Sequence, residues 1–339
     1  MPDFEFIVDD LFATPMNFLS RLEGFYFHIL DIRFYPEETI QMPYWIGAVL
    51  RNRFLYAAQQ IDTGQGRSLY ELLDSFPLSE AHPSFKSLHG GFPKGFLMDC
   101  STLPQSGGKC FLKKGHIYSF SLILIGNCAT YFPWLIQALK YMTDEGFGYP
   151  MTPLTLVDVS ERGGSLLYSG RSDALFPLEH PVVWHEAEAL PDMPCSLTFR
   201  FKTPVSLISR NRKAKTDIGY QGKLNGFPSF YQFMRSTMYR LCTLNMLYVN
   251  PDACFTSEDI DEFVKEAADA LLLEADLRME KRYSTPRVGE KNVYTMCGYT
   301  GSLTFGQVRS RYLPLLVLCS FLGIGNDINF GLGQFEVDY

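Results

Sequence analysis

The chain has 339 residues, of which 46% are hydrophobic and 15% aromatic, and its formal net charge is −7. This length favours two domains over one, and the apolar fraction is ample for two buried cores. The acidic balance argues against a uniformly basic nucleic-acid binder, so any such role must rest on a local basic patch.

The cysteines and the N-terminal residues predict a cytoplasmic protein. The 8 cysteines are scattered without a Cys-x-x-Cys pair, which reduced thiols explain better than a zinc site or a disulfide framework. Residues 2–10 are acidic and lack the basic region of a secretory signal. The longest uncharged run, residues 115–139, contains Gly126, Asn127 and Pro133, so it predicts a strand, a turn and a helix rather than a membrane span. We therefore expect a soluble protein with no membrane association, no cofactor and no metal.

The first half, residues 1–165, predicts one α+β domain with an N-terminal extension. Segments rich in aromatic and β-branched residues predict strands over residues 25–34, 117–125 and 154–159. Apolar residues recurring at three and four positions predict helices over residues 42–60 and 131–142. A polar insert, residues 61–108, holds a less certain strand. The order is the βαββαβ of a ferredoxin-like domain, with an antiparallel sheet and both helices on one face.

The same order recurs after residues 166–194, a stretch rich in proline and glycine that we interpret as a connector. Strands are predicted over residues 196–208, 293–305 and 330–337. Helices are predicted over residues 231–248, 255–275 and 312–321, the second starting at a cap-like Thr256-Ser257-Glu258. Both halves end in a strand, a helix with an early proline, a glycine-rich turn and a strand, which indicates an internal duplication. We expect a second ferredoxin-like domain, residues 195–339, with its glycine-rich loop at the junction with the first.

The last part of the chain contains two Gly-x-Gly pairs, Gly323 with Gly325 and Gly331 with Gly333. Glycine allows positive φ and close approach of another backbone, so this pattern predicts a surface of exposed N–H groups that suits a phosphate backbone. The spacing supports equally well a plain connection between the last helix and a closing strand. A dinucleotide fingerprint fits poorly, because its third glycine would fall at Ile328.

Basic residues gather in the second half of the chain. Between Cys195 and Val249 there is a single acid, Asp217, and the closest group of cations is Arg210, Arg212, Lys213 and Lys215. A second group includes Arg309 and Arg311. Solvated loop charge is the ordinary explanation, but this imbalance in an acidic protein, with aromatic residues nearby, favours a surface that contacts a phosphate backbone.

Several short motifs occur together and in order. They are Pro43-Tyr-Trp-Ile-Gly-Ala-Val-Leu-Arg-Asn-Arg-Phe54, Leu124-Ile-Gly, Phe132-Pro-Trp-Leu, Phe201-Lys-Thr-Pro-Val205, Arg282-Tyr-Ser-Thr-Pro, Gly298-Tyr-Thr-Gly-Ser-Leu, Leu313-Pro-Leu-Leu and Phe330-Gly-Leu-Gly333. With these motifs the chain resembles, over most of residues 25–339, the CRISPR-associated endoribonucleases of the RAMP superfamily that process precursor CRISPR RNA. The resemblance implies tandem ferredoxin-like domains with CRISPR repeat RNA bound along their junction. It also implies other CRISPR-associated effector subunits as further partners.

The chemistry that the resemblance implies is metal-independent cleavage. A base takes the proton of a ribose 2′-OH, this oxygen attacks the adjacent phosphorus, and an acid protonates the leaving 5′-oxygen. Cationic side chains or N–H groups stabilise the charge on the phosphate. Many relatives have a histidine just before the glycine-rich loop and a basic residue after its second glycine. This chain has Leu322 or Gly323 and Asn326 there, and no histidine between Met42 and Asp62.

The candidate catalytic residues are His28, Tyr44 and Arg51. His28 is chosen among the histidines because it belongs to the first-domain sheet beside the arginine-bearing helix, although a strand histidine more often has a structural role. A tyrosine serves better as an acid than as a base, because its ordinary pKa is about 10. The candidate RNA-binding residues are Arg53, Arg210, Arg212, Lys213, Lys215, Arg309, Arg311, Gly323, Gly325, Asn326, Gly331 and Gly333.

Two other classes of function compete with an RNA-cleaving enzyme. One is a RAMP-type subunit that holds CRISPR RNA without cutting it, which the missing histidines favour. The other is a small-molecule enzyme that binds a nucleotide phosphate at the glycine-rich loop. No Lys-Ser/Thr pair follows that loop and no carboxylate pair is placed for magnesium, so the sequence disfavours the second.

Overall fold

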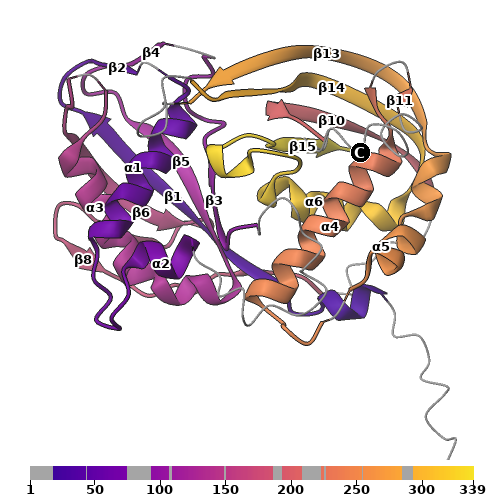
Figure 1. Cartoon of the computed structure of the whole chain (residues 1–339), viewed down its shortest axis with the longest axis horizontal. Helices are drawn as coiled ribbons and strands as arrows, with labels where there is room; N and C mark the ends of the chain where they lie inside the picture. Colours follow the sequence, from indigo (N-terminus) through magenta and orange to yellow (C-terminus); the bar gives the residue numbers. More distant parts are fainter. Residues whose placement is uncertain are drawn as a thin grey trace, which may run out of the picture.

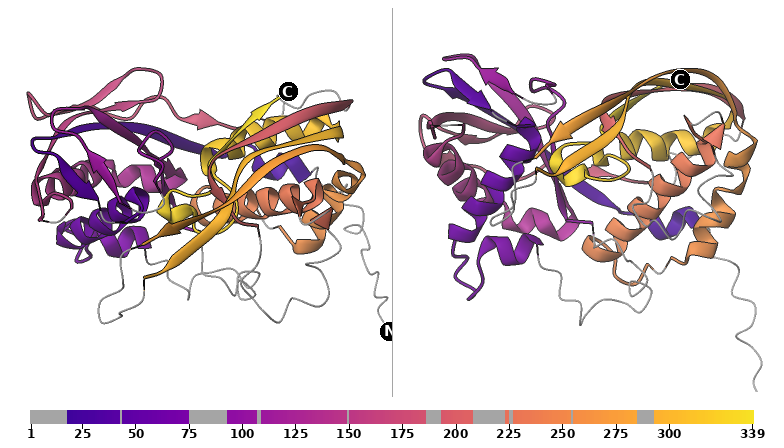
Figure 2. Two further views of the ribbon diagram at one scale, coloured as in Figure 1. Left: turned by 90° about the horizontal axis from the view of Figure 1, so that it is seen from above. Right: turned by 45° about the horizontal axis from the view of Figure 1, so that its top comes forward.

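The computed structural model describes residues 18–42, 44–74, 93–106, 109–148, 150–185, 193–207, 223–224, 227–253, 255–284 and 293–339. It shows two α+β units side by side (Figures 1 and 2). We refer to the unit built around strand β1 as the first domain and to the unit built around strand β10 as the second. Each contains a main antiparallel sheet. No helix within the described ranges is long and apolar enough to cross a membrane.

Strand β1 (Tyr26–Pro36) is the centre of the first sheet. It pairs antiparallel with β5 (Tyr118–Ile125) on one side and with β6 (Leu154–Glu161) on the other. Strand β3 (Phe96–Asp99) pairs with β5, so the order is β3-β5-β1-β6. Helix α1 (Ile46–Gln60) lies between β1 and β3 in sequence, and α3 (Phe132–Glu145) between β5 and β6. This is the ferredoxin-like βαββαβ order that the sequence predicts.

Three short strands extend the first sheet within residues 166–183. Strands β7 (Leu166–Ser169) and β8 (Ala174–Leu175) continue it beyond β6, and β9 (Val182–Val183) pairs with the start of β1. The interpretation of this stretch as a plain connector is therefore wrong for these strands, whose short runs carry too weak a pattern to be predicted. The smaller elements of the first domain are η1 (Phe18–Leu22), β2 (Ile40–Met42), α2 (Leu69–Asp74), β4 (Cys110–Leu112) and η3 (Gly126–Tyr131).

The second domain repeats this topology. Strand β10 (Pro194–Val205) lies between β14 (Thr295–Arg309) and β15 (Phe335–Asp338), and β13 (Leu271–Tyr283) pairs with β14, giving the order β13-β14-β10-β15. Helix α4 (Phe230–Tyr248) follows β10, and α6 (Leu313–Leu322) joins β14 to β15. The tandem ferredoxin-like architecture is therefore confirmed. Its smaller elements are β11 (Lys223–Leu224), β12 (Phe227–Pro228), α5 (Ser257–Phe263), η6 (Lys265–Asp269), η7 (Ser310–Tyr312) and η8 (Ile328–Phe330).

Two predicted elements are longer than the structure shows. The helix predicted over residues 255–275 begins as expected, with a capping box between Thr256 and Asp259, but α5 ends at Phe263 and β13 begins at Leu271. This segment is a strand because it pairs with β14 along the whole of β13, and local propensity cannot reveal that pairing. The closing strand predicted over residues 330–337 is shorter, because η8 occupies Ile328–Phe330 and β15 starts at Phe335.

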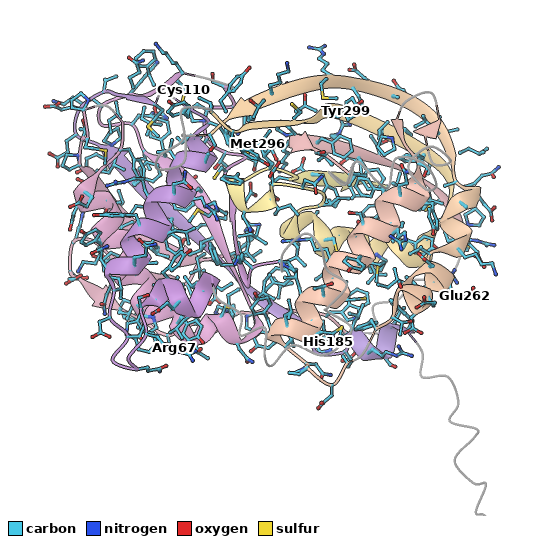
Figure 3. All side chains as sticks on the ribbon, viewed as in Figure 1. Arg67, Cys110, His185, Glu262, Met296 and Tyr299 are labelled. Atoms are coloured by element: carbon cyan, nitrogen blue, oxygen red, sulfur yellow. The ribbon has the colours of Figure 1, made fainter. Side chains whose placement is uncertain are left out.

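The two hydrophobic cores share elements of both domains. On β1, Leu30, Ile32 and Phe34 belong to the core with residues of α1 and α3, whereas Phe27 and Ile29 belong to the core of the second domain. In the opposite direction, Met296 at the start of β14 is buried in the core of the first domain (Figure 3). The domains are thus joined by mutual burial of apolar side chains.

Candidate nucleic-acid interface at the glycine-rich loop

The glycine-rich loop runs from the end of α6 to the start of β15, and its four predicted glycines all have positive φ. The angles are 67° at Gly323, 89° at Gly325, 76° at Gly331 and 78° at Gly333. A Cβ on Gly325 would lie 2.4 Å from the carbonyl oxygen of Ser206, and one on Gly333 would lie 2.3 Å from that of Ile324. Glycine is required here for both conformation and close packing.

Many backbone N–H groups of this loop donate hydrogen bonds to acceptors within the protein. Ile324 N–H bonds the carbonyl of Gly333 at 2.9 Å, Asn326 N–H bonds that of Ser206 at 2.8 Å, and Gly333 N–H bonds that of Pro204 at 3.1 Å. The N–H groups of Phe330, Gly331 and Gln334 also have acceptors within the chain. The predicted surface of exposed N–H groups is therefore wrong for these residues, because the loop uses its donors to hold its own shape against β10.

The loop docks onto the start of α1. Trp45, which is fully buried, donates from Nε1 to the carbonyl of Phe330 at 2.7 Å, and its backbone N–H bonds the carbonyl of Tyr283 at 2.9 Å. At Gly47 a Cβ would lie 2.4 Å from the same Phe330 oxygen. The guanidinium of Arg282 covers the Trp45 ring at 5.3 Å and pairs with Glu280 at 2.6 Å. Three segments far apart in sequence, around residues 45, 282 and 330, thus meet at one point.

Two of the predicted site residues lie beside this contact. The guanidinium carbon of Arg51 is 4.8 Å from the ring centre of Phe330, and Tyr44 immediately precedes Trp45 and is partly buried against the first core. Arg53 points to α3 instead, where Nη2 lies 3.7 Å from Glu145 and the guanidinium covers Tyr56 at 5.3 Å. Asn326 is partly exposed in the loop. Arg51, Tyr44 and Asn326 therefore carry polar groups on segments that meet at the junction.

His28 lies elsewhere, in a buried polar pair. It is 7% exposed, and its Nδ1 lies 2.6 Å from Glu161 Oε1. Glu161 Oε2 accepts the N–H groups of Glu179 at 3.0 Å and His180 at 2.9 Å. Burial opposes ionisation of Glu161, but these hydrogen bonds outweigh it and lower the pKa of the carboxyl. β1 is separated by β5 from β3, the strand nearest to Gly331, so His28 is about two strand spacings, about 10 Å, from that side of the loop. The structure thus does not bring His28 to the loop.

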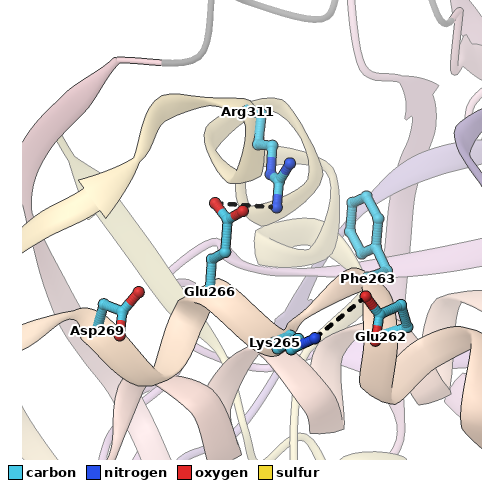
Figure 4. A pocket seen from close by; sticks show the side chains of 6 residues that line it. All are labelled: Glu262, Phe263, Lys265, Glu266, Asp269 and Arg311. Atoms are coloured by element: carbon cyan, nitrogen blue, oxygen red, sulfur yellow. Dashed lines mark hydrogen bonds and ion pairs between the residues drawn. The ribbon is translucent and has the colours of Figure 1, made fainter.

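The predicted basic residues divide into two groups. Arg210, Arg212, Lys213 and Lys215 lie outside the described residues. Arg309 and Arg311 pair with Glu266, at 3.1 and 3.4 Å. Arg311 and Glu266 line a pocket together with Glu262 and Asp269 (Figure 4). Arg309 and Arg311 precede the 10-residue helix α6, whereas the glycine-rich loop follows it, so about 15 Å of helix separates them from the loop.

On the outer face of β10 and β15, charged side chains pair with one another. Arg200 pairs with Asp338, and Lys202 pairs with Glu336 at 2.5 Å. The aromatic residues of β10, Phe199 and Phe201, face the core. Base stacking on strand aromatics, which RNA-binding ferredoxin-like sheets use, therefore has no counterpart on β10. This directs attention to the junction instead of the sheet.

Trp45 and Arg282 are junction residues that were not predicted from the sequence. Both belong to motifs that carry the family resemblance, so the motifs themselves held a signal. Neither motif predicts that the Arg282 guanidinium stacks on the Trp45 ring, because the two residues are far apart in sequence and meet only in the folded chain.

Comparisons with known proteins agree with this architecture. A family model described as an N-terminal domain matches residues 25–179, and the model of the CRISPR-associated endoribonuclease Cas6 matches residues 199–335. No curated protein sequence matches the chain. A Cas6 product complex from Thermus thermophilus is 16% identical, with 92% of this chain and 100% of that chain covered and a TM-score of 0.54.

Two structures of a Cas6-RT-Cas1–Cas2 complex, one of them partial, are each 14% identical with a TM-score of 0.53 and cover 93% of this chain. This chain spans only 46% and 29% of those longer chains. At such identities the likeness shows the fold. Residues 199–335 therefore match the model of the CRISPR-associated endoribonuclease Cas6 in sequence, and the chain as a whole has the fold of these Cas6 structures.

Proposed function

We propose that this protein binds CRISPR repeat RNA along the junction of its two domains and cleaves it to release guide RNAs. Attack by a ribose 2′-OH on the adjacent phosphorus needs no metal. The Cas6 match supports the substrate class and the reaction. One observation supports the position of the site: Arg51 lies against Phe330, where the glycine-rich loop of the second domain meets α1 of the first. Other CRISPR-associated proteins are proposed partners, since a related structure joins Cas6 to Cas1 and Cas2.

Each proposed role follows from the surroundings of the side chain. Arg51 stabilises the charge that develops on the phosphate, because its cation lies at the junction beside the loop. Arg53 is a weaker choice because Glu145 already offsets its charge. Tyr44 transfers a proton to the leaving 5′-oxygen. His28 could do so only if its pair with Glu161 opened, so in this proposal His28 serves the fold.

A second candidate function is RNA binding without cleavage. The observation that favours it is the sequence itself, which has no histidine in α1 or in the glycine-rich loop. Histidine is the usual proton-transfer group near neutral pH, because its ordinary pKa lies there. A chain without this group can still hold the RNA in place.

The deciding experiment is incubation of the purified protein with its own repeat RNA in EDTA, with a 2′-deoxy substitution at the cleaved nucleotide as a substrate control. The wild type should cut the RNA and leave the 2′-deoxy RNA intact. Tyr44→Phe should lower the rate by about 10²–10⁴-fold, as for removal of one acid–base group. Arg51→Ala should lower it by about 10²–10³-fold, and Arg200→Ala, an exposed arginine paired on the sheet, should not change it.

The same series separates the competing assignments. If Tyr44→Phe and Arg51→Ala cut as well as the wild type, the proposed site is wrong. If only His28→Ala abolishes cutting without lowering thermal stability, His28 is the proton-transfer group. Tight binding of the repeat RNA without any cleavage would establish the non-catalytic function.

A further inference from the structure

Arg240 on α4 differs from most other arginines in its lack of a carboxylate partner. Most described arginines lie within ion-pair distance of an acid: Arg21, Arg33, Arg53, Arg162, Arg200, Arg235, Arg282, Arg309 and Arg311. In the described part of the chain no carboxylate pairs with Arg240. Its Nε donates to the carbonyl of Leu322 at 3.1 Å, while its Nη2 is buried and has no acceptor among the described residues.

A buried cation without a counter-charge is costly, so this guanidinium needs an explanation. Burial lowers the pKa of Arg240 to about 10, which leaves it charged near pH 7. The carbonyl of Leu322 ends α6, and a helix C-terminus carries only about half a negative charge. That contact satisfies one donor of Arg240 and leaves most of its charge uncompensated.

A second buried donor lies at the same turn. Gln334 is 2% exposed, and its Nε2 has no acceptor among the described residues. This nitrogen lies 3.1 Å from the position that a Cβ would take on Gly323, the residue that follows Leu322. The end of α6 thus has an uncompensated cation at Leu322 and an unused amide donor close to the next residue, Gly323, where the glycine-rich loop begins.

We propose that Arg240, with Gln334 beside it, forms a phosphate-binding subsite for the RNA backbone at the start of the glycine-rich loop. This inference rests on the proposed function, since RNA supplies the phosphate. Arg240 is partly exposed as a whole residue, and its Nε holds the end of α6. The anion supplies the counter-charge that the described residues do not, and Arg suits this task because its planar fork matches phosphate oxygens.

The test compares the salt dependence of repeat-RNA binding in matched variants. Each phosphate of single-stranded RNA that the protein contacts contributes about 0.7 to the slope of log affinity against log salt. Arg240→Gln keeps an N–H donor for Leu322 but removes the charge, so the slope should fall by about 0.7 and the affinity by about tenfold or more. Arg235→Gln is the control, because Arg235 lies on the same helix but pairs with Asp261 at 2.5 Å; it should retain the wild-type slope.

The outcomes separate this subsite from the proposed function and from a purely structural role. A wild type that fails to bind repeat RNA contradicts the proposed function. A wild type that binds, with Arg240→Gln keeping the wild-type slope or with the slope of Arg235→Gln falling as much, overturns the subsite alone. If Arg240→Gln does not fold, Arg240→Lys decides: with its charge kept and its fork removed, it should show the wild-type slope and several-fold weaker binding, and wild-type affinity would refute the subsite.

Discussion

Replacing Gly47 by alanine should destabilise the protein, although helix propensity alone predicts the reverse. Gly47 is the second residue of α1, where alanine is favoured over glycine by about 1 kcal/mol in a helix interior. The new Cβ, however, would lie 2.4 Å from the carbonyl oxygen of Phe330 and 2.7 Å from Trp45 Nε1. Ordinary contacts to a Cβ begin near 3.4 Å, so the loop and the helix must separate by about 1 Å.

The magnitude follows from what this separation breaks. The 2.7 Å bond from Trp45 Nε1 to the Phe330 carbonyl would break, which leaves a buried donor unsatisfied at a cost of about 1–3 kcal/mol. Overpacking typically adds about 1–3 kcal/mol. After subtraction of the propensity gain of about 1 kcal/mol, the free energy of unfolding should fall by about 1–5 kcal/mol.

The assay is urea unfolding of the wild type and Gly47→Ala, followed by circular dichroism and by tryptophan fluorescence. Gln59→Ala, at an exposed position of the same helix, is the control and should leave the midpoint nearly unchanged. A Gly47→Ala variant as stable as the wild type would refute the reasoning, because it would show that the loop does not press on α1 as the structure indicates.

Three further predictions concern other parts of the molecule. The lowered pKa of Glu161 gives the fold a stabilisation that is fully present above the ordinary value of 4.5 and is lost as pH falls through the folded pKa. Glu161→Gln should therefore be less stable than the wild type at pH 7, and this difference should shrink as pH is lowered below 4.5 in urea unfolding; a difference that does not change with pH would contradict this. Replacing Arg210, Arg212 and Lys213 by alanine should flatten the salt dependence of RNA binding by about 0.7 for each phosphate that these side chains neutralise, and an unchanged slope would reduce them to ordinary surface charge. Replacing Arg309 and Arg311 by glutamine should change that slope less than Arg240→Gln does, because Glu266 already offsets their charge; filter binding at several salt concentrations measures all of these slopes.

The fold was largely predictable from the sequence because its strands and helices have strong local patterns. The failures occur where pairing decides. In β13, the run Leu271–Tyr283 alternates charges and apolar residues in a way that also fits an acidic helix, and only β14 fixes it as a strand. Strands β7 to β9 are too short to show any period.

The candidate site was predictable only in part, for a related reason. The four glycines predicted the position of the glycine-rich loop, but their spacing does not indicate whether its backbone N–H groups face solvent or β10. Arg51 was identified from its motif, and the structure places it beside Phe330. Arg240 gave no signal at all, because its lack of a carboxylate partner among the described residues is a property of the folded surroundings and not of its neighbours in sequence.

The exchange of side chains between the two cores has a consequence for synthesis on the ribosome. Leu332 and Met296, from the second domain, are buried in the core that β1, α1 and α3 build in the first. A chain that leaves the ribosome N-terminus first can pair β1 with β5 and β6 early. The position in the first core that Leu332 fills stays empty until residue 332 has been made. During that interval the first domain exposes a hydrophobic surface, which makes nascent chains targets for chaperones or aggregation. Limited proteolysis of chains stalled before and after residue 332 should show that the first domain becomes more resistant to protease once Leu332 has packed into its core.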